Sequence, residues 1–84
     1  MIGIQICSNR EWRSFKEILS INEDSIGLTP YGEYVSKNIE GKECVFYHSG
    51  ATKTKSTGAC QYAISKWNPN FIFVLGIWGG VHLN

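Results

Sequence analysis

An 84-residue chain forms at most one domain, and its hydrophobic share of 43% is typical of a folded protein and excludes a largely disordered one. The formal net charge of +1 and the lack of any basic run longer than Lys53-Thr54-Lys55 argue against nucleic-acid binding. The longest apolar stretch, Phe71 to Trp78, is far shorter than the roughly 20 residues that span a bilayer, and the N-terminus shows no secretory signal. We therefore expect a cytoplasmic protein without a membrane partner.

The N-terminal residues predict a strand followed by a helix. Ile2 to Cys7 are β-branched and nearly all apolar, as in a buried strand. Ser8 is a favoured N-cap residue, and Glu11 follows at the spacing of a capping box. Apolar residues then recur at helical spacing and predict one buried stripe, formed by Trp12, Phe15, Ile18 and Leu19.

The middle of the chain predicts a short strand, a hairpin and a second helix. We expect the short strand over residues 25–28, and a hairpin of strands 34–39 and 43–48 around Glu40-Gly41-Lys42. Ser56 is the expected cap of the second helix, which ends at Asn68-Pro69-Asn70. One side of this helix carries apolar residues, namely Ala59, Cys60, Ala63, Ile64 and Trp67.

The last predicted strand, Phe71 to Leu75, is apolar at every position, which predicts cover on both faces of a sheet. The element order β-α-β-β-β-α-β indicates an α/β fold with a mixed sheet, in which the strand before the second helix and the strand after it run parallel. If the first strand runs the same way, three carboxyl ends open on one edge, where ligands of open α/β sheets bind.

Three segments are expected to meet at that edge: residues 7–11, 49–56 and 76–80. Glu11 is the only carboxylate in them, and a carboxylate in a cleft can take a proton from water or from a sugar hydroxyl. Its position in a capping box with Ser8 offers a purely structural explanation as well, and the two roles are compatible.

The second and third segments suit a small polar ligand. The loop that begins Ser49-Gly50-Ala51 leads into a helix N-terminus and carries hydroxyls and two lysines, which suit an anion or a sugar, although an ordinary solvated loop has the same composition. Gly76, Gly79 and Gly80 allow close approach to a ligand, or only a sharp turn. Three widely spaced cysteines and two isolated histidines indicate no metal site, and we expect no cofactor.

Four segments of the chain, in this order, resemble the N-terminal part of the nucleoside phosphorylase superfamily. The similarity is greatest to its 5′-methylthioadenosine/S-adenosylhomocysteine nucleosidase-like branch. The segments are an Ile-Gly-Ile strand with Ser8-Asn9-Arg10-Glu11-Trp12; Pro30-Tyr31-Gly32-Glu33-Tyr34; Ser49-Gly50 through Cys60-Gln61-Tyr62-Ala63-Ile64 with Lys66-Trp67-Asn68-Pro69; and Leu75-Gly76-Ile77-Trp78-Gly79-Gly80-Val81.

This resemblance implies cleavage of the N-glycosidic bond of purine nucleosides, by hydrolysis or phosphorolysis, in a three-layer α/β/α sandwich. It implies that Glu11 is the acid–base residue and that a purine nucleoside, with or without phosphate, is the small-molecule partner. It also implies a homo-oligomer. The residues that correspond to ligand-binding segments of the family are Ser8, Gly50, Ala51, Gly76, Ile77, Trp78 and Gly79.

Two departures from the family pattern qualify the expected activity. Ile77 lacks the hydroxyl that is common at its position, and Trp78 is bulky where a small residue is usual, which disfavours phosphorolysis more than hydrolysis. Family members also continue further, with the remaining site residues in that part. We therefore expect residues 1–84 to be one incomplete domain, inactive alone; the alternative is a non-catalytic nucleoside-binding or oligomer-forming domain.

Overall fold

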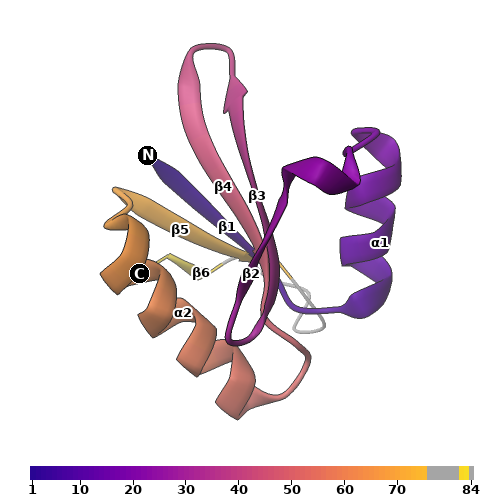
Figure 1. Ribbon diagram of the computed structural model, residues 1–84. Coiled ribbons are helices and arrows are strands. Elements are labelled where there is room, and N and C mark those ends of the chain that lie inside the picture. Colours follow the sequence, from indigo (N-terminus) through magenta and orange to yellow (C-terminus); the bar gives the residue numbers. More distant parts are fainter. Residues whose placement is uncertain (76–81, 84) are drawn as a thin grey trace.

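The computed structural model describes residues 1–75 and 82–83, which form a small α/β domain with a mixed sheet and two helices (Figure 1). A short 3-10 helix at Glu23–Ser25 precedes the second strand. The helices and strands follow in the order β1 (Ile2–Ile6), α1 (Asn9–Ile18), β2 (Ile26–Thr29), β3 (Gly32–Ile39), β4 (Lys42–His48), α2 (Lys53–Trp67), β5 (Phe71–Leu75) and β6 (His82–Leu83).

The sheet has the strand order β2-β3-β4-β1-β5-β6, so β1 lies near its centre. β1 pairs in parallel with β4 on one side and with β5 on the other. The parallel course predicted for β4 and β5 is therefore confirmed, the condition that β1 runs the same way is met, and their carboxyl ends lie at one edge. β2, β3 and β6 pair in antiparallel fashion and extend the sheet on both sides.

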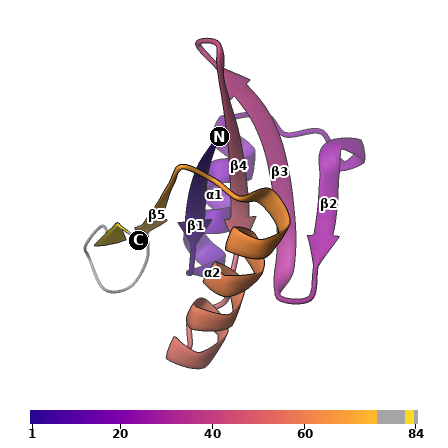
Figure 2. The same ribbon diagram turned by 90° about the vertical axis from the view of Figure 1, so that its left-hand side faces the viewer.

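The two helices cover opposite faces of the sheet (Figures 1 and 2). On the α1 face, buried Ile6, Trp12 and Val35 form one cluster, with Phe15 and Phe46 packed against it. On the α2 face, a second cluster joins the helix to the sheet and consists of Cys7, Tyr47, Ala59, Ala63, Ile72 and Val74. The alternation of side chains along each strand divides the core between the two helices in this way.

Helix α1 begins as predicted but buries less than predicted. The Ser8 side chain accepts a hydrogen bond from the Glu11 backbone N–H at 3.1 Å, which confirms the N-cap. Trp12 is buried, whereas Ile18 and Leu19 are 79% and 38% exposed. The expected stripe is wrong at its end: the helix ends at Ile18, and Ile18 and Leu19 are exposed.

Helix α2 begins four residues before the position expected. Its N-cap is Thr52, whose hydroxyl accepts from the Lys55 N–H at 3.2 Å, so the prediction of Ser56 as the cap is wrong. Ser56 lies in the first turn instead. At the other end, Asn68 adopts the left-handed conformation with φ 46° and donates to the Ile64 carbonyl, which stops the helix where the sequence predicts.

Strand β5 is covered on one face only. Ile72 and Val74 are buried under α2, but Phe71 and Leu75 on the other face are 54% and 38% exposed. The prediction of cover on both faces is therefore wrong at the two ends of this strand, although Phe73 between them is half-buried; the cluster beneath α1 draws on β3, β4 and β1 and includes no residue of β5. Neither of the helices within this range is long and apolar enough to cross a membrane.

Candidate functional site

The carboxyl ends of the three parallel strands are joined directly by hydrogen bonds. The Ser49 N–H donates to the Ile6 carbonyl at 3.1 Å, and the Cys7 N–H donates to the Leu75 carbonyl at 3.0 Å. The residues that follow β1 and β4 therefore lie side by side with the last residue of β5. The third predicted loop, with Gly76, Ile77, Trp78 and Gly79, lies outside the described residues.

Glu11 lies in the first turn of α1, close after the end of β1. Its side chain is exposed, and among the described residues its carboxylate makes no hydrogen bond or ion pair. The backbone of Glu11 completes the Ser8 cap and leaves this carboxylate unoccupied. Among the described residues the Ser8 N–H donates no bond to the Glu11 carboxylate, so the predicted capping box is wrong and only its Ser8 half is confirmed. Ser8 itself is half-buried.

The loop after β4 begins with a backbone turn at Gly50 that favours glycine. Gly50 has a φ of +92°, a conformation that residues with a Cβ rarely adopt. Ala51 and Thr52 follow it in exposed positions, and the Thr52 hydroxyl then caps α2. Ser49 is fully buried and donates its hydroxyl to the Gly50 carbonyl at 3.1 Å. Gly50 and Ala51 are thus brought to the same edge as Ser8.

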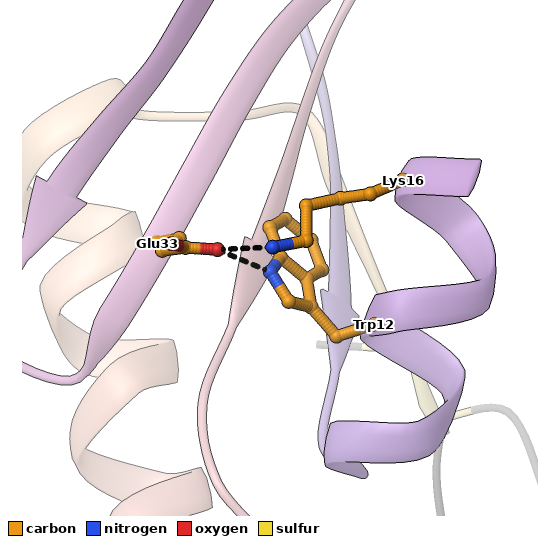
Figure 3. A network of polar contacts seen from close by, with 3 residues as sticks. All are labelled: Trp12, Lys16 and Glu33. Carbon is orange, nitrogen blue, oxygen red and sulfur yellow. Dashed lines mark hydrogen bonds and ion pairs between the residues drawn. The ribbon is translucent and has the colours of Figure 1, made fainter. Parts of the chain in front are cut away.

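A second carboxylate, Glu33, lies on the α1 face at the start of β3. One of its oxygens accepts hydrogen bonds from the Trp12 indole N–H at 2.8 Å and from the Lys16 ammonium at 2.9 Å (Figure 3). The bond from Trp12, followed by that from Lys16, lowers the pKa of Glu33 from its usual 4.5. Glu33 is therefore held as an anion that joins β3 to α1, and it is a poor proton acceptor.

His48 ends β4 next to this ion pair. Its ring stacks on Trp12, with centroids 5.8 Å apart and planes 15° apart. Within the described part of the chain, its buried Nε2 has no hydrogen-bond partner. The backbone of His48 lies close to Gly32, and a residue with a Cβ would not fit there, because that Cβ would lie 2.9 Å from the His48 carbonyl oxygen. Burial lowers the pKa of His48 from its usual 6.5, and the Cys7 backbone and Glu33 oppose that effect.

These two groups predict a loss of stability in acid. Because the pKa of His48 is lower in the folded state, its contribution is complete above its unfolded pKa of 6.5 and is lost as pH falls through the folded value. The pKa of Glu33 is lowered as well, so its contribution is lost only below 4.5. Melting temperature should therefore begin to fall below about pH 6.5.

Thermal melts at several pH values check this expectation. A His48→Phe variant keeps an aromatic ring against Trp12 but cannot titrate, so its melting temperature should stay level between about pH 6.5 and 5. An equal fall in wild type and variant over that range would show that His48 is not the group responsible.

A cavity of about 370 Å³ lies away from the predicted site. Its lining comes from the connection after α1 and from the second half of β3, and consists of Ser20, Ile21, Asn22, Ser25, Val35, Ser36, Lys37 and Asn38. Because β3 and β4 are antiparallel, this half of β3 lies toward the opposite edge from His48. The cavity therefore contains none of the predicted site residues.

Two polar residues inside strands of the sheet, Glu33 and Gln5, could have been recognised from the sequence as unusual. Glu33 belongs to one of the segments that resemble the nucleosidases, but no role was predicted for it. It lies two residues before Val35 on β3, so its carboxylate is on the same face of the strand and points toward α1. Gln5 is an amide inside an otherwise apolar strand. Across residues 1–75 and 82–83, no group of three or more His, Cys, Asp or Glu is arranged to hold a metal ion.

Comparison with known proteins gives no match to a family model, to a curated protein or to a solved structure.

Proposed function

We propose that this chain provides the strand-edge part of a purine nucleoside-cleaving site, similar to that of 5′-methylthioadenosine/S-adenosylhomocysteine nucleosidases. The observation that supports this most is the meeting of Cys7, Ser49 and Leu75 at one edge, beside a helix whose first turn presents the unoccupied Glu11 carboxylate. The four ordered segments of the sequence support the choice of a nucleoside. The three-layer sandwich of that family belongs to the same proposal.

In this proposal Glu11 acts as the general base. A water molecule attacks the anomeric carbon of the ribose while the bond from that carbon to the purine nitrogen breaks, and Glu11 takes the proton that the water loses. The electron pair of the broken bond passes to the purine, which takes up a proton from solvent. Positive charge develops on the ribosyl group in the transition state, and a nearby carboxylate stabilises it. Glu33 is unsuited to this role, because its charge is already satisfied by Trp12 and Lys16.

Hydrolysis is favoured over phosphorolysis. Ser8, Gly50 and Ala51 are the described residues of the edge that we propose to contact the ribose; at Gly50 the Lys55 side chain packs close to the backbone, because an added Cβ would lie 3.0 Å from its Cδ. Ile77 lacks the hydroxyl that would help to hold a phosphate. Water is therefore the proposed nucleophile, and 5′-methylthioadenosine is the substrate to test.

The test combines binding and turnover in one sample. Isotope-labelled protein is titrated with 5′-methylthioadenosine while amide chemical shifts are recorded, and release of adenine is measured by chromatography. Shift changes at residues 7–11 and 49–52 support a nucleoside site, and adenine release identifies it as catalytic. A protein that shows neither would contradict the proposal.

An oligomer-forming domain is the second candidate, and the exposure of Phe71 and Leu75 favours it. These side chains stand on the α1 face of β5, where half-buried Phe73 lies between them, so a strip of apolar surface faces outward. If this strip is an interface, the melting temperature rises with protein concentration and does not respond to a nucleoside.

A further inference from the structure

Gln5 is a buried amide at the centre of the sheet. It lies on β1, points to the α2 face and is 0% exposed. An amide that is buried without partners is unfavourable by roughly 1–3 kcal/mol, and an aliphatic side chain at this position of a parallel strand avoids that penalty. The presence of the amide therefore needs an explanation beyond packing.

Every polar atom of the Gln5 side chain has a partner. Its Oε1 accepts from the Tyr47 hydroxyl at 2.8 Å. Its Nε2 donates to the Ser56 carbonyl at 2.9 Å and to the Ser56 hydroxyl at 2.8 Å. Gln5 thus joins the central strand to β4 on one side and to the first turn of α2 on the other.

The first turn of α2 has little else to hold it. Lys53, Thr54 and Lys55 are exposed, and the buried residues of the helix, Ala59 and Ala63, lie beyond this turn. Ser56 is the half-buried member of the turn, and its contacts are with Gln5 and, at 3.7 Å, with the Cys7 sulfur. Hydrogen bonds are directional, so these fix the distance and rotation of the turn relative to β1.

We propose that Gln5 is a positioning residue, which holds the first turn of α2 and the preceding loop, residues 49–52, at the carboxyl edge of the sheet. The inference rests on the proposed function in one respect: the loop matters for ligand binding because it carries Gly50 and Ala51. Gln5 itself does not contact a ligand. Its place beneath the edge keeps the loop next to the end of β1, where Ser8 lies.

Amide hydrogen exchange of the ligand-free protein tests this role. In a Gln5→Leu variant that retains the circular dichroism spectrum of the wild type, exchange at the hydrogen-bonded amides of residues 49–56, those of Ser49, Lys55 and Ser56, should accelerate at least about tenfold, while amides of β1 and β4 change much less. Tyr47→Phe is the matched control: it removes the other hydrogen bond of Gln5 and should not accelerate residues 49–56 selectively.

Two results would overturn the inference: no change at residues 49–56 in Gln5→Leu, or a uniform acceleration throughout the domain. If Gln5→Leu does not fold, Ser56→Ala removes the hydroxyl contact alone and must give the same local pattern, and its absence would equally overturn the inference. The outcome is separate from the proposed function, because it needs no nucleoside. Failure of the wild type to bind 5′-methylthioadenosine would reject the nucleoside site and leave the exchange result standing.

Discussion

Replacing Trp12 with alanine should lower the free energy of unfolding by about 3–5 kcal/mol, the range for a large aromatic side chain lost from a core. Trp12 is 4% exposed and stacks on both Phe15 and His48. Its indole N–H also bonds to Glu33, so the variant loses the packing of α1 and one partner of a carboxylate. Urea denaturation followed by circular dichroism at 222 nm measures the change.

The Trp12→Phe variant separates packing from hydrogen bonding. It keeps an aromatic ring in the cluster and loses the bond to Glu33, for which we expect a smaller loss of about 1 kcal/mol. A total stability of 5–15 kcal/mol is typical of small domains, so the loss expected for Trp12→Ala is a large fraction of the total. A loss below about 1 kcal/mol in Trp12→Ala would show that α1 is not held through this residue.

If residues 1–84 release adenine from 5′-methylthioadenosine, contrary to the expectation that they are inactive alone, replacing Glu11 with glutamine should lower that rate by about 10²–10⁴-fold, the usual contribution of a general base. The substitution removes the negative charge and the proton acceptor. It leaves the backbone N–H that donates to Ser8, so the cap of α1 and the melting temperature should remain as in the wild type. The rate is measured by chromatography with the protein at saturating nucleoside.

Glu17→Gln is the matched control for this experiment. Glu17 is an exposed carboxylate on the same helix but lies near its other end, away from the carboxyl edge of the sheet. The same chemical change there should leave the rate unaltered. Equal rates for wild type and Glu11→Gln would remove Glu11 from the mechanism, and equal losses in both variants would point to a general effect of charge.

The sequence predicts most of the elements because their signals are local. Ser8 stands in front of a helical apolar pattern, and its hydroxyl has one donor within reach, the Glu11 N–H. Asn68 tolerates the left-handed conformation that ends α2. The hairpin turn carries positive φ values at Glu40 and Gly41, 51° and 82°, which a short turn between antiparallel strands needs.

The errors occur where tertiary contacts decide the outcome. Ser56 and Thr52 are both suitable caps; the Thr52 hydroxyl caps the helix, and the Ser56 hydroxyl instead accepts from Gln5, which is distant in sequence. Phe71 and Leu75 are apolar whether or not a helix covers them, so their exposure reflects where α1 packs. The periodicity of one segment therefore predicts neither the contact of Ser56 with Gln5 nor the position of α1 relative to β5.

The candidate site was predicted in part for the same reason. The parallel course of β1, β4 and β5 follows from the crossover through α2, and it brings Ser8 and Gly50 to one edge. The Glu33 ion pair could not be inferred from spacing, because it joins α1 to a strand 17 residues away from Lys16. The pair joins strand β3 to α1, the helix whose first turn carries Glu11.

The titration with 5′-methylthioadenosine, followed at individual amides, tests the central claim most directly. We expect saturable chemical-shift changes at residues 7–11 and 49–52, on the two chain segments that leave the carboxyl ends of β1 and β4. The amides around the cavity at Ser36 and Asn38 should not move, since that cavity lies toward the other edge. The absence of any saturable change, or changes confined to that cavity, would contradict a nucleoside site at the carboxyl edge.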